Sequence, residues 1–311
     1  MPMLADFIAW LETQAIGYHP DADIRPYLTF RIGDRVRLLV VCTSVVQLEE
    51  CLLRGRQTGL PLILLGGGSN IVFSDQSTEA IVLVNNSSRI RPLSGQKVRV
   101  ESGVRNSALL SWCVKHRCGG LEFLAGIPGS IGGAAAVNAG SMGRSMAQIV
   151  AAARVLDAQG VVREVAGGYF RFGYRESVFK YGREAILELT LQATAENASA
   201  IAARIKANIE YRQSRHPSYE KFSAGCFFKN PLVEGQRVSA GRLIEEAGLK
   251  GQACGDIVVS ENHGNFLLNL GRGGMTDLMK MEQLIVNRVR KKSRVILERE
   301  VIYVSANGGK S

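Results

Sequence analysis

Short apolar runs alternate with amphipathic stripes in the first part of the chain. Residues 37–42 (RLLVVC), 62–65 and 80–84 have the continuous apolar pattern of buried strands. Residues 44–57 have the spacing of an amphipathic helix. Because strand and helix alternate here, the pattern predicts a small α/β unit over about residues 20–85.

A second group of elements follows this unit. Residues 98–104 (VRVESGV) predict a strand, and a helix is expected after it. Ser107 is the predicted cap of that helix, and the pair Gly119-Gly120 is its predicted end. Strand-rich sequence over residues 150–195 completes the region.

Helical spacing dominates the last third of the chain. Residues 196–215 predict a polar, alanine-rich helix, and residues 239–247 predict a short helix that ends at Gly248. A longer helix is expected over 276–291. The run VILEREVIYV at 295–304 then predicts a final strand, and the tail ANGGKS is expected to fray.

At 311 residues the chain is too long for one ordinary core. This length predicts two or three domains, and the order of the elements separates three units of an α+β protein. Their expected bounds are residues 1–85, 86–197 and 198–311.

The N-terminal stretch MPMLADFIAWLETQ predicts an amphipathic helix. It carries Asp6 and Glu12 and lacks a basic region and a small-residue cleavage site, which argues against a secretory signal. No apolar run reaches the roughly 18 residues of a membrane span. With 46% hydrophobic and 21% charged residues, the sequence is typical of a globular protein that stays in the cytoplasm and has no membrane partner.

Charge and cysteine usage narrow the candidate partners. The six cysteines show no CxxC spacing and no paired histidines, so neither a metal site nor a disulfide framework is expected. The formal net charge of +10 favours anionic partners. The only dense basic run, RVRKKSR at 288–294, has the composition of a solvated helix end, and phosphorylated small molecules would use the charge as well as nucleic acid would.

Two glycine-rich loops carry the first functional signal. LGGGSN at 65–70 follows an apolar strand, and AGIPGSIGGAAAVNAGSMG at 125–143 has no bulky side chain except Ile, Pro, Val and Met. Glycines let a backbone approach a ligand closely and direct its N–H groups at one point. Either loop alone could be a packed structural turn. Together they indicate a dinucleotide with an extended pyrophosphate.

Seven motifs then occur in the same order as in a known enzyme family. They are LGGGSNIVFSD, GIPGSIGGAAAVNAG, FGYRESVFK, SAGCFFKNP, AGRLIEEAGLKG, VSENHGNFLLN and LEREV. The similarity around them extends from about Leu28 to Val304. In these motifs the chain resembles the UDP-N-acetylenolpyruvoylglucosamine reductases. The early Arg31-Ile32-Gly33 is followed by Asp34, where the family often has a second glycine. The short stretch between Lys180 and Cys226 resembles the subgroup that lacks a long tyrosine loop.

The resemblance implies a fold and an activity. The fold is a two-part FAD-binding region of the vanillyl-alcohol-oxidase-like type, followed by a C-terminal α/β domain for the substrate. The activity is NADPH-dependent reduction of UDP-N-acetylglucosamine enolpyruvate to UDP-N-acetylmuramate through FAD, a step of cytoplasmic peptidoglycan precursor synthesis. The expected partners are the UDP-sugar and NADPH, without nucleic acid, and the protein is expected to be a monomer.

The resemblance also implies which residues hold the cofactor. They belong to the early Arg-Ile pair and to the two glycine-rich loops. The expected FAD-binding residues are Arg31, Ile32, Gly66, Gly67, Gly68, Ser69, Asn70, Gly126, Ile127, Pro128, Gly129, Ser130 and Gly132.

Reduction of an enol ether conjugated to a carboxylate needs a cation near the carboxylate and a positioned acid. By resemblance, Arg175 in FGYRESVFK stabilises the developing enolate, and a guanidinium suits a planar carboxylate. Glu300 is the second glutamate of the LExEV motif and is the expected catalytic carboxylate. Period-two alternation places Glu300 and Glu298 on one face of the final strand, together with the apolar residues Ile296, Ile302 and Val304. The alternative is that this face belongs to an edge strand and is exposed to water.

Cys226 occupies the place where the family usually has a serine that donates a proton. A thiol keeps a dissociable proton there, with a reference pKa of about 8.5. A nucleophilic role is not required by this chemistry. A buried inert thiol is the other interpretation, because that is the usual state of an isolated cysteine.

Further positions are expected to line the substrate site. Asn230 and His263 align with family contacts to the UDP-sugar, and Arg215 matches a basic contact roughly. Lys229 and Tyr174 are expected to lie in the same cavity. His263 could instead be a structural histidine.

Two other functions remain open from the residues alone. One is a different oxidoreductase of the same flavin fold, such as a sugar or hydroxy-acid oxidase, which would not need Arg175, Cys226 and Glu300 together. The other is a basic nucleic-acid-binding protein, whose binding would weaken steeply with salt and which would carry no chromophore.

Overall fold

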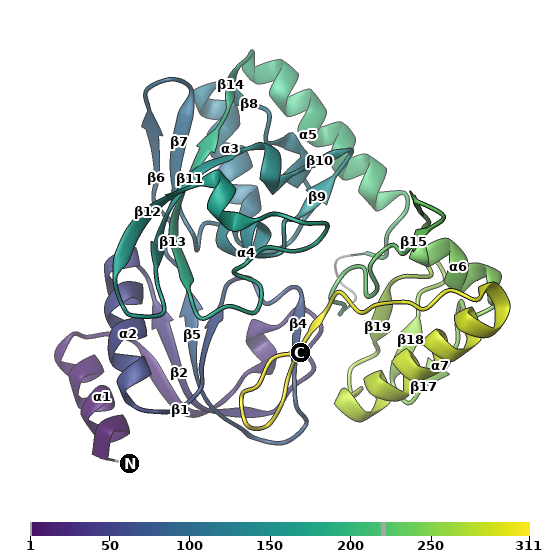
Figure 1. Cartoon of the computed structure of the whole chain (residues 1–311), viewed down its shortest axis with the longest axis horizontal. Helices are drawn as coiled ribbons and strands as arrows, with labels where there is room; N and C mark the ends of the chain where they lie inside the picture. Colours follow the sequence, from purple (N-terminus) through teal and green to yellow (C-terminus); the bar gives the residue numbers. More distant parts are fainter. Residues whose placement is uncertain (1, 219–221) are drawn as a thin grey trace. The chain divides into compact units, whose positions relative to one another are not determined.

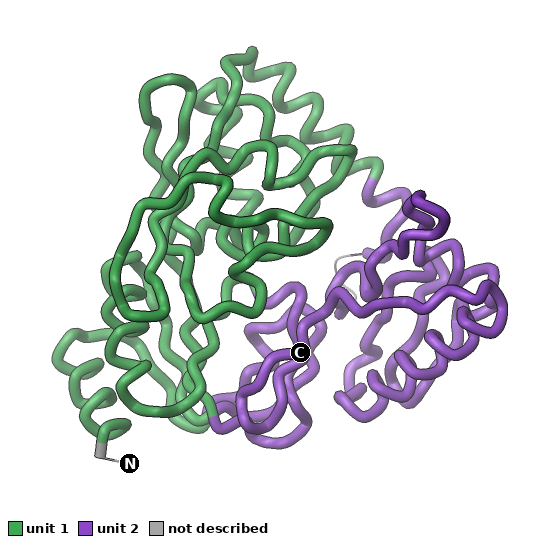
Figure 2. Tube along the Cα trace, viewed as in Figure 1, with its two compact units in different colours: residues 1–21, 37–67, 80–211 green, residues 22–36, 68–79, 212–311 purple. Residues whose placement is uncertain are grey.

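The computed structural model describes residues 2–218 and 222–311 (Figure 1). The chain forms two compact units whose segments interleave along the sequence (Figure 2). Unit 1 comprises residues 1–21, 37–67 and 80–211, and unit 2 comprises residues 22–36, 68–79 and 212–311.

The first sheet of unit 1 is flanked by the two N-terminal helices, α1 (Pro2–Thr13) and α2 (Val45–Gln57). Its strand order is β1-β2-β5-β3, with β3 and β5 parallel. The strands are β1 (Tyr18–Asp23), β2 (Arg35–Cys42), β5 (Thr78–Asn85) and β3 (Leu62–Leu65). The helix and strands predicted over residues 37–84 are confirmed, and Ser44 Oγ caps α2 by accepting a hydrogen bond from Gln47 N at 3.2 Å.

The second sheet of unit 1 is antiparallel, with the order β12-β11-β13-β7-β6. Its strands are β12 (Val162–Ala166), β11 (Val150–Leu156), β13 (Ala185–Gln192), β7 (Lys97–Glu101) and β6 (Ile90–Leu93). The helices of this region are α3 (Asn106–His116), α4 (Ile131–Ala136) and α5 (Ala198–Gln213). Leu109, Ile131 and Leu189 are fully buried in the core of this region.

Shorter pieces complete unit 1. The paired strands are β8 (Cys118–Gly119) with β14 (Thr194–Ala195), and β9 (Gly140–Ser141) with β10 (Arg144–Ser145). The 3₁₀ helices of this unit are η2 (Glu122–Leu124), η3 (Met146–Gln148) and η4 (Gly167–Phe170).

The predicted ends of α3 were wrong. The N-cap is Arg105 rather than Ser107, and the helix ends at Arg117, which adopts φ 55° and donates its N–H to Cys113 O and Val114 O. The early start has a tertiary cause, because Asn106 N donates to Gly129 O at 3.1 Å and fixes the backbone at that point. Arg117, whose backbone adopts the left-handed conformation, therefore ends the helix before Gly119-Gly120.

Unit 2 contains a three-stranded antiparallel sheet, β17 (Ala253–Cys254), β18 (Ile257–Val259) and β19 (Leu267–Asn269). Helices α6 (Ala240–Glu246) and α7 (Met275–Ser293) share its core, in which Ile244, Ile285 and Phe227 are buried. The other elements are η1 (Arg25–Tyr27), the pair β15 (Leu232–Val233) and β16 (Gln236–Arg237), and the parallel pair β4 (Ile71–Phe73) and β20 (Ile302–Val304).

The predicted final strand over 295–304 is regular only in β20. Ile296 is 65% exposed, whereas Val301 and Tyr303 are buried, so period-two alternation does not run through the segment. The expected apolar face around Glu298 and Glu300 was therefore wrong. The cause is that the segment changes partners: its first part pairs with residues 227–229 and its last part pairs with β4.

The prediction that the tail frays was also wrong. Ser311 N donates to Tyr303 O at 3.0 Å, and Tyr303 N donates to Ser311 O at 2.8 Å. A bridge between Val304 and Lys310 continues this pairing. Composition suggested a free end, but the backbone groups of the tail are satisfied by β20.

The arrangement of helices and sheets is α+β (Figure 1). Unit 1 contains two separate hydrophobic cores, one around the first sheet and one around the second. The division into three domains at residues 85 and 197 stays a prediction. Within the described ranges, no helix is both long enough and apolar enough to cross a membrane.

One side chain of the first glycine-rich motif stabilises a helix far away in sequence. The Asp75 carboxylate accepts hydrogen bonds from Met275 N at 2.6 Å and Thr276 N at 3.1 Å, in the first turn of α7. Gly274, the N-cap of α7, has no side chain that could do this. Asp75 therefore acts as the cap of α7 from outside the helix.

We predict that Asp75→Ala lowers the free energy of unfolding by about 1–2 kcal/mol, the usual effect of losing a cap. Asp75→Asn keeps an acceptor oxygen and should lose less. Urea denaturation of the two variants beside the unmodified chain checks this order. An unchanged midpoint for Asp75→Ala would contradict the capping role.

Candidate active site

The two glycine-rich loops meet backbone to backbone in unit 1. A Cβ atom placed on Gly67 would lie 2.3 Å from Cα of Gly129, and one placed on Gly66 would lie 2.3 Å from Oγ of Ser130. Any side chain at these positions would force the loops apart. Gly129 also has φ 115°, a region that favours glycine.

The connection between β7 and α3 runs beside the second loop. Gly132 N donates to Ser102 O and Ile131 N donates to Val104 O, each at 2.8 Å. Further along, the Asn106 side chain donates to Ile127 O at 3.0 Å. The second loop is therefore held by hydrogen bonds along one edge. Sequence reasoning missed this edge because residues 102–106, which form it, carry no motif of their own.

The segment that carries Arg175 lies against the last part of the second loop. Arg175 Nη2 donates to Gly140 O at 2.9 Å, and its guanidinium carbon lies 5.4 Å from the centroid of the Tyr174 ring. Asn138 Nδ2 donates to Gly173 O at 2.7 Å. Arg175 itself has φ 59°, an unusual conformation for arginine. The structure thus brings Arg175 and Tyr174 to the second loop within unit 1.

The end of the first glycine-rich loop belongs to unit 2. Gly68 has φ 62°, and a Cβ there would lie 1.9 Å from Tyr27 O. Asn70 Nδ2 donates to Glu300 O at 3.3 Å, and Asn70 O accepts from Ile302 N at 3.0 Å. One predicted cofactor residue is therefore bonded directly to the backbone of a predicted catalytic residue.

The early Arg-Ile pair has two different environments. Arg31 has φ 58°, and its Nη1 donates to Arg25 O at 3.1 Å. Ile32 is 1% exposed and packs in the core of unit 2, while its carbonyl accepts from Phe73 N. The Ile32 side chain is thus a core side chain in unit 2.

Cys226 and Glu300 lie on adjacent backbone segments of unit 2. Glu300 N donates to Phe227 O, and Lys229 N donates to Glu298 O, each at 2.8 Å. This is the pattern of a short antiparallel pair. The structure brings these two predicted catalytic residues together, and both side chains are half-buried. Arg175 belongs to unit 1.

Asn265 hydrogen-bonds to the other edge of the segment 226–229. Its Oδ1 accepts from Phe228 N at 2.9 Å, and its Nδ2 donates to Phe228 O at 2.8 Å. Its backbone carbonyl accepts from Phe227 N at 2.8 Å. Asn265 is 2% exposed, so an amide side chain here replaces a neighbouring strand. Sequence reasoning missed this residue.

Three of the predicted substrate residues lie in different surroundings within unit 2. Lys229 is buried, and its Nζ pairs with Glu298 Oε1 at 2.5 Å. Asn230 Oδ1 accepts from Ala240 N at the start of α6, at 3.0 Å. Arg215 lies in the exposed stretch after α5.

His263 lies in an aromatic cluster with His216 and Phe266. Its ring centroid is 5.4 Å from that of His216 and 5.1 Å from that of Phe266. Burial is the main cause that lowers the pKa of His263, and it lowers the pKa of His216 to about 4. His263 Nδ1 accepts from Asn265 N at 3.1 Å, so its proton is on Nε2 when the ring is neutral.

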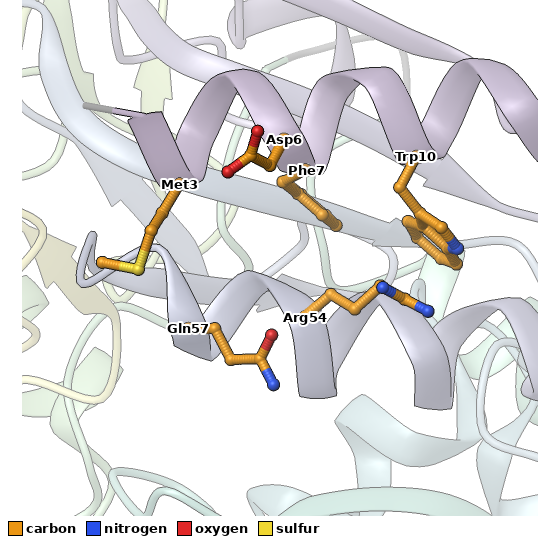
Figure 3. Close-up of a pocket in the computed structure, with 6 residues that line it drawn as sticks. All are labelled: Met3, Asp6, Phe7, Trp10, Arg54 and Gln57. Atoms are coloured by element: carbon orange, nitrogen blue, oxygen red, sulfur yellow. The ribbon is translucent and has the colours of Figure 1, made fainter.

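A small pocket lies elsewhere in unit 1, between α1 and α2 (Figure 3). Its volume is about 120 Å³, and the Arg54 guanidinium lies 4.5 Å from the centroid of the Trp10 ring. None of the residues predicted for cofactor, substrate or catalysis lines it. Its lining residues are Met3, Asp6, Phe7, Trp10, Arg54 and Gln57.

Comparison with known proteins identifies the class. Residues 36–166 match the family model of the FAD binding domain. Residues 216–304 match the model described as UDP-N-acetylenolpyruvoylglucosamine reductase, C-terminal domain. Together with the glycine-rich loops, these matches define an FAD-dependent oxidoreductase.

Individual relatives give the family. The chain is 36% identical to UDP-N-acetylenolpyruvoylglucosamine reductase from Chlamydia muridarum, over 88% of this chain and 90% of that protein. It is 32% identical to the reductase of the same name from Bacillus velezensis, over 90% and 92%. The chain belongs to the UDP-N-acetylenolpyruvoylglucosamine reductase family.

Solved structures agree with this assignment. The crystal structure of UDP-N-acetylenolpyruvylglucosamine reductase (MurB) from Thermus caldophilus matches with a TM-score of 0.75 and 29% identity, over 93% of this chain and 98% of that one. The fold class, the family resemblance and the FAD cofactor predicted from the motifs are confirmed.

Two buried polar atoms of unit 1 fit a bound FAD. Asn106 Oδ1 and Lys180 Nζ have no hydrogen-bond partner among the residues that the structure describes. Asn106 Nδ2 donates to Ile127 O of the second loop, and Lys180 follows Ser177, whose Oγ donates to Ala136 O of the same loop. A buried ammonium group is costly unless an anion pairs with it. A ligand with negative charge and hydroxyl groups matches these unused atoms.

We predict that Asn265→Ala lowers the free energy of unfolding by about 2–3 kcal/mol, because it leaves the buried N–H and C=O of Phe228 without partners. Chemical denaturation measures the loss. Asn262→Ala is the matched control, since Asn262 is an exposed asparagine of the same motif. Equal stability of the two variants would show that the Asn265 hydrogen bonds contribute nothing.

Proposed function

We propose that this chain catalyses NADPH-dependent reduction of UDP-N-acetylglucosamine enolpyruvate to UDP-N-acetylmuramate, in cytoplasmic peptidoglycan precursor synthesis. Membership of the reductase family over nearly the whole chain supports the reaction type. The observation that carries the proposal is the backbone pairing that holds Cys226 and Glu300 on adjacent segments. The proposed reaction needs no second copy of the chain, so we propose that the protein acts as a monomer.

The two glycine-rich loops and the Arg31-Ile32 pair are proposed to hold FAD. In unit 1, residues 66–67 and 126–132 are proposed to line the cofactor, with Gly67 and Gly129 letting the backbone approach it closely. The N–H groups of Ile127, Ile131 and Gly132 donate within the protein, so these three residues would contact the cofactor in other ways. In unit 2, Arg31 and residues 68–70 are proposed to contribute. A bound FAD would supply the hydride-transfer chemistry that couples NADPH oxidation to reduction of the substrate.

The reacting bond is the carbon–carbon double bond of the enolpyruvyl group. Hydride forms a new bond at the terminal carbon, and the electron pair of the double bond moves to the adjacent carbon and its carboxylate. We propose that the Arg175 guanidinium stabilises this negative charge, since a planar cation can bond both carboxylate oxygens.

A proton must then reach the adjacent carbon. We propose that Cys226 Sγ donates it, and that the resulting thiolate takes a proton from solvent. The net change is one NADPH and one proton consumed for each enol ether reduced. Cys226 is half-buried, which shields the donor while leaving it accessible. Glu300, whose backbone carbonyl is bonded to Asn70, is proposed to act at the same reacting centre.

The remaining residues are proposed to bind the UDP-sugar. The Asn230 Oδ1 accepts from Ala240 N at the start of α6, and its side-chain amide is proposed to contact the sugar. His263 is neutral near pH 7 because burial lowers its pKa, and its Nε2–H can donate to an acceptor oxygen. Tyr174, Lys229 and Arg215 complete the proposed set.

The test separates the two halves of the reaction for Cys226 variants. Cys226→Ala should keep FAD and accept hydride from NADPH normally, because that step uses no acid at this position. Oxidation of its reduced flavin by the enolpyruvyl substrate should slow by roughly 10² to 10⁴, the usual contribution of general acid catalysis. Cys226→Ser should retain most activity, since a hydroxyl supplies the same proton.

Stopped-flow absorbance of the flavin measures both rates. Cys254→Ala is the matched control, because Cys254 is another half-buried thiol of unit 2 and should leave both rates unchanged. Fast reoxidation of reduced Cys226→Ala would exclude Cys226 as the donor. Failure of the unmodified protein to oxidise NADPH in response to the enolpyruvyl substrate would exclude the function itself.

A further inference from the structure

We propose that Arg105 is a further cofactor-binding residue of this chain, and that its guanidinium pairs with the diphosphate of FAD. The inference rests on the proposed placement of FAD along the two glycine-rich loops. It concerns a residue that lies outside every sequence motif described above.

The position of the guanidinium is the first argument. A Cβ atom placed on Gly67 would lie 2.8 Å from Arg105 Nη1 and 2.3 Å from Cα of Gly129. A cation therefore stands where the two loops touch each other. Arginine suits a phosphate there, because its planar fork can donate two parallel hydrogen bonds to phosphate oxygens.

The backbone fixes Arg105 at this place. Arg105 forms an antiparallel bridge with Ser130, and the neighbouring Asn106 N donates to Gly129 O at 3.1 Å. These contacts hold the backbone of Arg105 against the second loop, so the position from which its side chain extends is fixed. It is exposed, so a ligand can reach it.

Protein stability does not explain an arginine at this position. Arg105 is the N-cap of α3 and makes no capping hydrogen bond. A cation at a helix N-terminus opposes the helix dipole, and serine, threonine, aspartate or asparagine is preferred there. Within the parts of the chain that the structure describes, no hydrogen bond or ion pair engages this guanidinium.

An independent observation at the same place points to a ligand. Asn106 is 2% exposed, and its Oδ1 has no hydrogen-bond partner within the described ranges, although its Nδ2 donates to Ile127 O. An amide oxygen accepts hydrogen bonds only, so it fits a hydroxyl group. FAD carries hydroxyl groups beside its diphosphate, and Arg105 and Asn106 can serve these two chemistries from adjacent positions.

The test compares FAD with riboflavin, which lacks the diphosphate. Both are added to protein from which the flavin has been removed, and binding is followed by quenching of flavin fluorescence. Arg105→Gln should raise the Kd for FAD by about 10- to 100-fold, the scale of losing charge-assisted hydrogen bonds. The Kd for riboflavin should change less than about twofold. Arg105→Lys should recover part of the FAD affinity by keeping the charge.

Two controls separate this role from a structural one. The melting temperature of flavin-free Arg105→Gln should be unchanged or raised, because the substitution removes a charge that opposes the helix dipole. Lys115→Ala removes a charge from the last turn of the same helix. That site is about 15 Å away along the axis, and the variant should leave the Kd for FAD unchanged.

An unchanged Kd for FAD in Arg105→Gln would overturn the proposal. Equal weakening of FAD and riboflavin would overturn it as well, because it would mean that the loop contact had changed. The proposed function fails by a different result, the absence of substrate-dependent NADPH oxidation in the unmodified holoenzyme. Either idea can therefore fail while the other stands.

Discussion

Backbone meets backbone where Gly67 of the first glycine-rich loop lies against Gly129 of the second, with no side chain between them. Gly66 and Gly132 lie equally close to serine residues, because a Cβ atom on Gly66 would lie 2.3 Å from Ser130 Oγ and one on Gly132 would lie 2.7 Å from Ser102 Cβ. Any Cβ atom would separate the loops and break the hydrogen bonds that hold the second loop to residues 102–106. The surface that we propose for the cofactor in unit 1 depends on this close approach, and so does the position of Arg105.

A comparable constraint operates in unit 2. Residues 226–229 are hydrogen-bonded along both edges of their backbone. The Asn265 side chain binds one edge, and the backbone of residues 298–300 binds the other. Every backbone hydrogen-bonding group of Phe228 is thereby used by a single amide. The backbone pairing, rather than the side chain of residue 226, fixes the position of the proposed proton donor, so a thiol and a hydroxyl could both be held there. Both units thus position their proposed functional groups through main-chain contacts.

Much of this organisation could be predicted from the sequence. The apolar runs at 37–42 and 62–65 became the strands expected, and Ser44 caps the helix between them. The two glycine-rich loops were recognised as a pair. Local patterns work where local forces decide, as in buried strands and capped helices.

The remaining features depend on contacts between distant residues. The start of α3 is fixed by Gly129 rather than by a capping residue, and the segment after 295 changes partners where a single strand was expected. Asn265 acts on Phe228 across 37 positions of sequence. Arg105 lies outside the motifs, and its location only becomes informative once both loops are placed beside it. Such features carry no periodicity or motif that a sequence pattern could reveal.

The most direct test of the glycine contact is the affinity of Gly67→Ala for FAD. A single methyl group at this position should raise the Kd for FAD at least about tenfold, because it displaces the second loop. Gly168→Ala is the matched control, since a Cβ atom there meets nothing within 4 Å and the affinity should not change. Fluorescence titration of flavin-free protein measures both values, and circular dichroism confirms that each variant is folded. If folded Gly67→Ala binds FAD as tightly as Gly168→Ala, the close approach of the loops is not what builds the cofactor site.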